Sequence, residues 1–172
     1  MTLDVAKGAA LVFVAVIVQV TLLSDINVSH GAPNLVLVVL VSVALLRGTI
    51  YGAAAGFAAG LVVDTATLQT LGVSSLLLTL AGYWIGRYGE TTGRDRTHAP
   101  FLSVGVVTVL YSLGALILHY MLGDPASAQR VLIEALPFAL LFNLALTLPV
   151  YALCRRIFMP PPSGLEEVRL LG

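Results

Sequence analysis

The segment GTIYGAAAGFAAGLVVD, residues 48–64, carries the strongest structural signal in this chain. Four glycines and then one acid recur at every fourth residue, Gly48, Gly52, Gly56, Gly60 and Asp64, and this spacing keeps them on one slowly turning helix face. In a soluble helix each glycine would cost roughly 1 kcal/mol relative to alanine. In lipid, small residues let another helix backbone approach closely. The segment therefore predicts a membrane helix with a packing face that ends in an acid.

Composition supports a membrane protein. The chain has 172 residues, of which 58% are hydrophobic and 10% charged, and its mean hydropathy is +0.97, whereas soluble domains carry about 25% charged residues. The formal net charge of zero argues against a nucleic-acid partner. A single cysteine, Cys154, excludes an intramolecular disulfide and a cysteine-rich metal site. We expect no cofactor.

Six apolar segments are candidates for membrane spans. The second and third form either two short helices or one helix from Pro33 to Asp64. One helix of that length would be about 48 Å long and would place Arg47 near the bilayer centre, where a charge costs at least ~2.5 kcal/mol. We therefore predict two helices that are separated at Gly48. The expected spans are Val5–Leu23, Leu35–Leu46, Thr49–Val63, Gly72–Tyr88, Phe101–Leu122 and Leu132–Cys154.

The positive-inside rule favours six spans over five. With six spans, every Lys and Arg except Arg130 falls on one side, and both termini are cytoplasmic. The external loops are then 24–32, 64–71 and 123–130, and the largest internal loop is 89–100. We predict an all-α, polytopic bundle in which residues 1–158 form a six-helix transmembrane domain. Residues 159–172 form a short cytoplasmic tail that begins with a proline-rich spacer.

Several polar positions are candidate binding residues, each with a structural alternative. Asp64 binds a partner, coordinates an external segment or lines a cavity, or it is a helix-end carboxylate that faces water. Pro33 and Asn34 either contact a partner or simply initiate and cap the second span. The polar groups within spans either line a lumen for a small ligand or form interhelical hydrogen bonds, and we favour the hydrogen bonds. These groups are Gln19, Thr79, His119, Asn143 and Thr147.

The sequence predicts neither a catalytic nor a metal site. No spacing brings two acids together for general acid–base work. The three histidines, His30, His98 and His119, are far apart in the expected topology, which makes a shared metal site implausible. The glycine run also lacks the Gly-Lys-Ser/Thr ending of a phosphate-binding loop.

Several of these motifs resemble the MreD family, the small membrane proteins of the bacterial rod-shape system. The similar motifs are Pro33-Asn34-Leu35, Arg47-Gly48, Gly56-Phe57-x-x-Gly60-Leu61-x-x-Asp64 and Leu71-Gly72, followed in the last span by Asn143, Pro149-x-Tyr151 and Arg155-Arg156. The resemblance covers about residues 5–158. One departure is Asn34, because the family often has aspartate there.

The resemblance implies a non-enzymatic scaffold in the bacterial cytoplasmic membrane. Such a protein would bind MreC and would link cytoplasmic MreB filaments to the peptidoglycan synthases outside. A second copy of the chain is a further candidate partner. The face from Gly48 to Asp64 would then pack a helix of this chain or of a partner. MreD-like proteins are also similar in architecture to the substrate-binding components of energy-coupling-factor transporters. The alternative function is therefore a vitamin-binding component of such a transporter.

Overall fold

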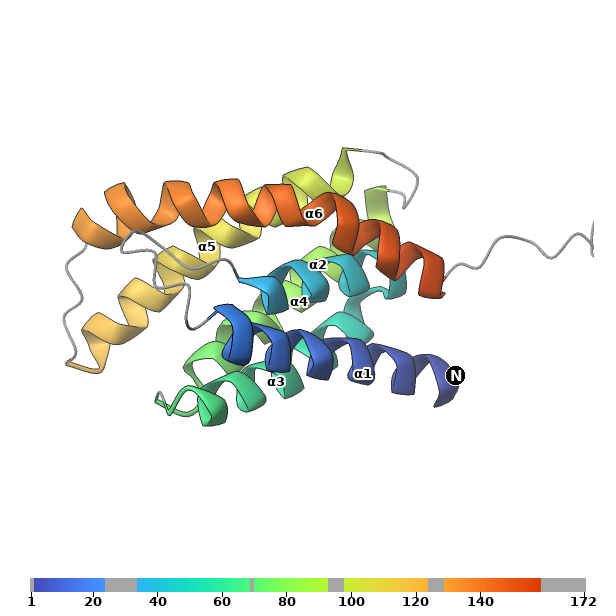
Figure 1. Cartoon of the computed structure of the whole chain (residues 1–172), viewed down its shortest axis with the longest axis horizontal. Helices are drawn as coiled ribbons and strands as arrows, with labels where there is room; N and C mark the ends of the chain where they lie inside the picture. The colour runs from blue at the N-terminus through green and yellow to red at the C-terminus, as the bar shows by residue number, and fades with distance from the viewer. Residues whose placement is uncertain (1, 24–33, 69, 93–97, 124–128, 159–172) are drawn as a thin grey trace, which may run out of the picture.

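The structure is a computed structural model that describes residues 2–23, 34–68, 70–92, 98–123 and 129–158. These residues form six α-helices and two short π-helical segments, with no β-strand among them (Figure 1). All six expected apolar segments are helical, so the all-α class is confirmed. The elements are α1 (Thr2–Val18), η1 (Gln19–Leu23), α2 (Leu35–Arg47), α3 (Thr49–Ala66), α4 (Val73–Thr92), α5 (Ala99–Met121), η2 (Arg130–Ala135) and α6 (Leu136–Phe158).

Three helical stretches in the described residues are long and apolar enough to cross a membrane. They are Thr49–Ala66, Ala99–Met121 and Val131–Phe158, and the shorter apolar helices are Lys7–Thr21 and Leu35–Arg47. Length and composition thus support a membrane protein. The number of crossings stays a prediction, because two of the expected spans are short and α4 combines apolar residues with a polar carboxyl end.

The division of the central segment into two helices is confirmed. Gly48 lies between α2 and α3 with φ +93° and ψ −173°. Residues other than glycine rarely adopt this backbone conformation. Its N–H closes α2 by donating to the carbonyl of Ala44 at 2.8 Å. The chain therefore turns at Gly48, and no single helix extends from Pro33 to Asp64.

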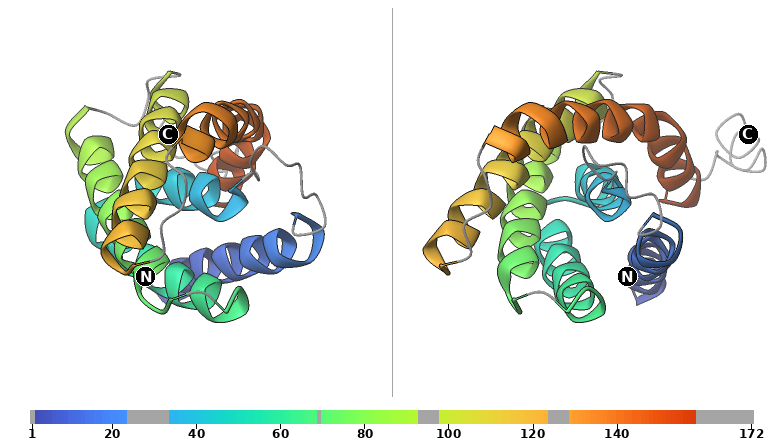
Figure 2. Two further views of the ribbon diagram at one scale, coloured as in Figure 1. Left: turned by 90° about the vertical axis from the view of Figure 1, so that its left-hand side faces the viewer. Right: turned by 60° about the vertical axis from the view of Figure 1, so that its left-hand side comes forward.

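Helix α2 occupies the centre of the bundle. All of its residues from Val36 to Leu46 are buried, and it contacts each of the other five α-helices. Figure 2 shows it enclosed, with α1 and α3 on one side and α6 arching over the other. A helix that is apolar all round has no face to offer water and is buried in a core, which explains why this one is central.

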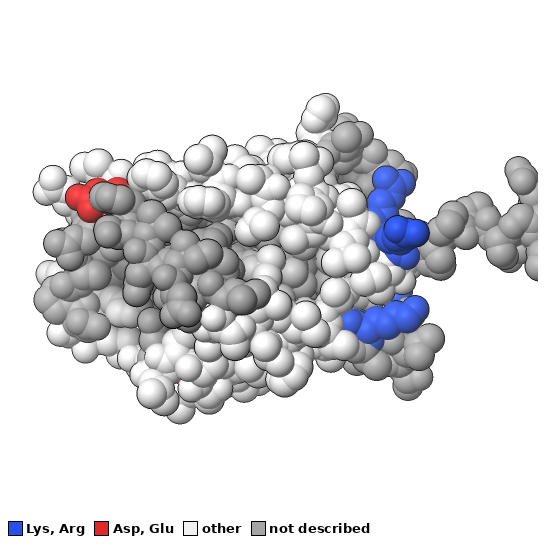
Figure 3. Space-filling view, viewed as in Figure 1, with Lys and Arg blue, Asp and Glu red and all other residues white. Residues whose placement is uncertain are grey.

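The two ends of the bundle differ in charge. Helix α1 begins and α6 ends at the same end of the molecule (Figure 1). The Lys and Arg side chains visible in Figure 3 lie at this end, and the visible acidic ones lie at the other. The last turns of α2 and α6 contribute Arg47 and the pair Arg155 and Arg156.

Two predicted loop boundaries are wrong. Helix α3 continues to Ala66, so Asp64 is helical and does not begin a loop. Helix α4 continues to Thr92, so the segment predicted as a loop from Gly89 begins in a helix. Both helices continue past their apolar residues because their final turns contact the neighbouring helix, as described below.

Candidate functional site

The predicted glycine face packs against α4 of the same chain. A Cβ atom added at Gly52 would overlap the backbone of Gly82, one at Gly56 the backbone of Leu78, and one at Gly60 the backbone of Ser75. Glycine is therefore required at these three positions by backbone-to-backbone contact. The face could pack a helix of this chain or of a partner, and in the structure it packs a helix of this chain.

Helix α4 contributes a matching set of glycines, which we did not predict. Gly82 faces Gly52 and Gly86 meets the backbone of Gly48, whereas Gly89 meets the backbone of Leu45 on α2. The signal was present in the sequence, since Gly82 and Gly86 have the same four-residue spacing as the glycines of α3. We call the contact between the two glycine faces the α3–α4 seam.

Asp64 lies at one end of this seam and is 1% exposed. Its carboxylate accepts hydrogen bonds from the backbone N–H groups of Gly72 at 2.8 Å, Ser74 at 3.2 Å and Ser75 at 3.5 Å. These N–H groups begin α4 and have no partner within that helix, and a negative charge there also interacts favourably with the helix dipole. Of the alternatives for Asp64, a helix-end carboxylate that faces water therefore does not match the structure.

Glu90 plays the corresponding role at the other end of the seam. It lies in the last turn of α4, and its Oε1 accepts a hydrogen bond from the backbone N–H of Thr49 at 2.8 Å, while Oε2 accepts one from the Thr49 hydroxyl at 2.7 Å. Each helix of this antiparallel pair thus supplies an acid to the amino end of the other. We did not predict this role, because Glu90 follows the last apolar residues of its segment and had the appearance of a loop residue.

The amino end of α2 is held by three other polar side chains. Asn34 is the N-cap and accepts from the N–H of Leu37 at 2.9 Å. Gln19 accepts from the N–H of Val36 at 2.9 Å, and Asn143 accepts from the N–H of Asn34 at 2.9 Å. The capping alternative for Asn34 therefore matches the structure, while its predicted neighbour Pro33 lies outside the described residues.

The remaining polar groups within the helices also have local partners. The Asn143 amide donates to the hydroxyl of Thr108 at 3.0 Å, so Gln19 and Asn143 form the interhelical hydrogen bonds that we favoured. Thr79, His119 and Thr147 instead bond to carbonyls of their own helices. None of these five residues is among those that line the groove described next.

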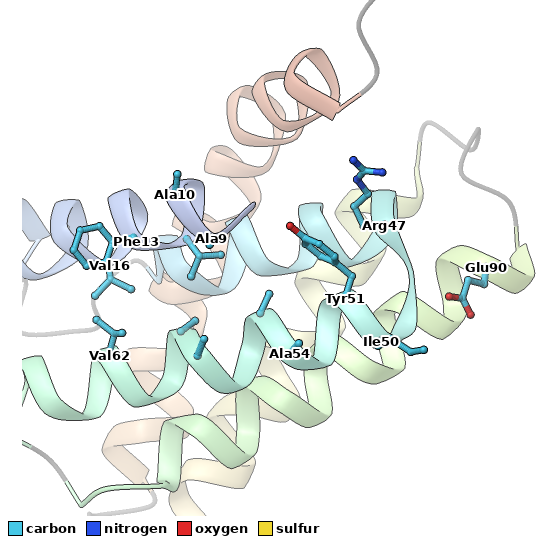
Figure 4. Close-up of a pocket in the computed structure, with 14 residues that line it drawn as sticks. Ala9, Ala10, Phe13, Val16, Arg47, Ile50, Tyr51, Ala54, Val62 and Glu90 are labelled. Carbon is cyan, nitrogen blue, oxygen red and sulfur yellow. The ribbon is translucent and has the colours of Figure 1, made fainter. Parts of the chain in front are cut away.

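A lateral groove of about 960 Å³ lies between α1 and α3. Its walls carry mostly alanine and valine side chains together with the aromatic ring of Phe13. They include Ala9 and Phe13 on α1 and Ala54, Ala58 and Val62 on α3. Figure 4 shows these walls facing one another. Its polar lining residues are Arg47, Tyr51 and Glu90, which all come from the end of the bundle where α2 ends and α3 begins.

The described residues contain no group of three or more His, Cys, Asp or Glu side chains that could hold a metal ion. The polar groups that we traced act on helix ends and helix contacts. A comparison with protein-family models matches residues 3–157 to the model described as rod shape-determining protein MreD. No curated protein and no solved structure gives a significant match.

Proposed function

The chain belongs to the MreD family of rod shape-determining proteins, and from this premise we propose that it is a non-enzymatic membrane scaffold that binds MreC. Membership gives the chain a role in rod shape determination. The match over residues 3–157, from α1 to α6, is the observation that carries the proposal. In the proposed role the protein helps couple cytoplasmic MreB filaments to the enzymes that synthesise peptidoglycan.

We place all six α-helices across the bacterial cytoplasmic membrane, with both termini in the cytoplasm. Arg47, Arg155 and Arg156 lie in the last turns of α2 and α6, and Arg47 contacts Phe158, the last residue of α6. The Lys and Arg side chains visible in Figure 3 gather at one end of the bundle, which supports this orientation because cytoplasmic loops carry an excess of Lys and Arg. The short helix α2 is compatible with a spanning bundle, because protein rather than lipid surrounds it.

The α3–α4 seam contributes to the scaffold as an internal support. Gly52, Gly56 and Gly60 contact α4, and Asp64 and Glu90 fix the two ends of the pair. A partner helix on the same face would have to displace α4. We therefore propose that the face from Gly48 to Asp64 holds the shape of the surface that MreC recognises, and that MreC itself contacts helices on the outside of the bundle.

Co-purification tests the proposal. The full chain, carrying an affinity tag and produced together with MreC from the same genome, is extracted in mild detergent and captured. We expect MreC to be recovered in fixed stoichiometry, and an unrelated tagged six-helix membrane protein serves as the control. Monodisperse, helical protein that captures no more MreC than the control does would overturn the proposal. Mass spectrometry of small molecules in the same preparation tests the alternative, because a stoichiometric vitamin would favour the transporter component.

A further inference from the structure

The outer helices of the bundle differ in the length of apolar surface that they expose. The visible basic and acidic side chains lie at opposite ends of the long axis of the molecule (Figure 3), and α6 runs along that axis (Figure 1). The length of apolar surface along a helix therefore sets the thickness of hydrocarbon that the helix fits. We call this length the apolar height of the helix.

Helix α4 has a small apolar height. Its exposed face carries Leu76, Leu80 and Trp84, and its first charged residue is the exposed Arg87. The distance from the start of α4 at Val73 to Arg87 is about 21 Å at 1.5 Å per residue. Trp84, which is 66% exposed, lies one turn before Arg87, and tryptophan is enriched at membrane–water interfaces. The hydrocarbon beside α4 therefore ends near Trp84.

Helix α3, which packs against α4 in the seam, is also short in this respect. Its apolar segment runs from Ile50 to Val63, which is about 20 Å, and Thr65 is exposed in the next turn. A typical hydrocarbon core is about 30 Å thick, so it exceeds the apolar height of both helices by about 10 Å. We call the exposed faces of α3 and α4 the short side.

Helices α5 and α6 have the apolar height that a typical bilayer needs. On α5 the exposed apolar side chains extend from Leu102 to Leu122, which is about 30 Å. The segment formed by η2 and α6 has exposed charges at Glu134 and Arg155, about 31 Å apart. A helix that is too long can tilt, whereas a helix that is too short thins the lipid around it. The mismatch is therefore confined to the short side.

We propose that the short side gathers phospholipids with short acyl chains, so that the bilayer is thinner beside α3 and α4 than beside α5 and α6. Long acyl chains at this surface would extend past Trp84 and surround Arg87, and a charged side chain in hydrocarbon is costly. Shorter chains leave Arg87 at the level of the headgroups. This inference rests on the membrane orientation proposed above.

The single tryptophan of the chain, Trp84, is a natural probe of the short side. The full-length protein is reconstituted in brominated dioleoyl phosphatidylcholine mixed with either dimyristoleoyl or dioleoyl phosphatidylcholine, and the quenching of tryptophan fluorescence is measured. A lipid that binds more strongly beside the tryptophan displaces the brominated lipid and reduces quenching. The matched control is the double variant Trp84→Phe, Leu141→Trp, because Leu141 on α6 is also 66% exposed.

We expect dimyristoleoyl phosphatidylcholine to bind beside Trp84 about threefold more strongly than the dioleoyl lipid, since a mismatch of several Å is enough for a factor of this size. The tryptophan at position 141 should show no such preference. Equal preferences at the two sites, in protein that gel filtration and circular dichroism show to be folded, would overturn the proposal. Leu148→Trp in the Trp84→Phe background reports the same side of α6 if the first control does not fold, because Leu148 is 64% exposed.

Arg87→Leu tests apolar height as the cause, because it extends the apolar face of α4. We expect this variant to lose most of the preference at Trp84, whereas Arg156→Leu, which removes an exposed charge from the end of α6, should retain it. A full preference in Arg87→Leu would contradict the proposal. MreC capture is measured in the same preparations. Capture of MreC together with equal lipid preferences at the two sites would reject this inference alone, while absence of quenching at both sites would reject the membrane orientation as well.

Discussion

The carboxylate of Asp64 takes the place of water at the start of α4. It accepts hydrogen bonds from three backbone N–H groups in a site that is 1% exposed. Leaving a buried donor without a partner costs about 1–3 kcal/mol. One side chain on α3 therefore stabilises the first turn of a helix to which it does not belong.

Replacing this acid by alanine tests that role. We expect Asp64→Ala to lower the free energy of unfolding by about 3 kcal/mol, because several buried N–H groups lose their acceptor. Thr65→Ala is the control, since the hydroxyl of Thr65 is exposed and bonds only to carbonyls of its own helix, and its cost should stay within about 0.5 kcal/mol. The measurement is the unfolding midpoint in detergent. Equal midpoints for the two variants would contradict the capping role.

Asn143 and Thr147 provide a second comparison at this scale, because both are fully buried on α6 one turn apart. Asn143 joins three helices through Asn34 and Thr108, whereas Thr147 bonds only to the carbonyl of Asn143. We expect Asn143→Leu to cost about 1–2 kcal/mol and Thr147→Val to cost less than half of that. The measurement is the unfolding midpoint of each purified variant. A larger effect of Thr147→Val would show that the hydrogen bonds of Asn143 are not the source of stability.

At the scale of elements, the α3–α4 seam depends on the absence of side chains. Gly56 meets the backbone of Leu78, whereas the nearest atom to a Cβ at Gly105 would be Leu140 Cδ2 at 3.9 Å. We expect Gly56→Ala to destabilise the protein by about 2 kcal/mol through overpacking, while Gly105→Ala stays within about 0.5 kcal/mol of the wild type. Thermal unfolding in detergent measures both changes. A tolerated Gly56→Ala would mean that the two helices separate more easily than their contact indicates.

Most of the helix boundaries could be predicted from the sequence, because the length of an apolar segment and the residues that interrupt a helix are local signals. The starts of α2 at Leu35 and α3 at Thr49 match the expected spans. The partner of the glycine face could not be predicted, since periodicity gives a face and does not say which helix covers it. The role of Glu90 was missed for the same reason, and the interhelical hydrogen bond of Gln19 was expected without its partner. Each of the two side chains caps a helix other than its own, and such pairs exist only once the helices are placed.

At the scale of the whole molecule, the proposed topology puts the α3–α4 turn and the start of η2 outside the cell. A Cys154→Ala background removes the only cysteine, and single cysteines are introduced by Thr67→Cys, Gln129→Cys, His98→Cys and Ser163→Cys. We expect a membrane-impermeant maleimide to label the first two in intact spheroplasts. The last two should react only after permeabilisation, because the proposed topology puts the basic end of the bundle in the cytoplasm. Labelling of Ser163→Cys from outside would rule out the six-span arrangement with cytoplasmic termini.

The enclosed position of α2 has a consequence for how the protein fits different membranes. This helix has 13 residues and is about 20 Å long, well short of a hydrocarbon core of about 30 Å. Because its neighbours are the five surrounding helices and not acyl chains, its length is free of the constraint of hydrophobic matching. The peripheral helices then adapt to a thicker or thinner bilayer by tilting around α2, whose length does not change.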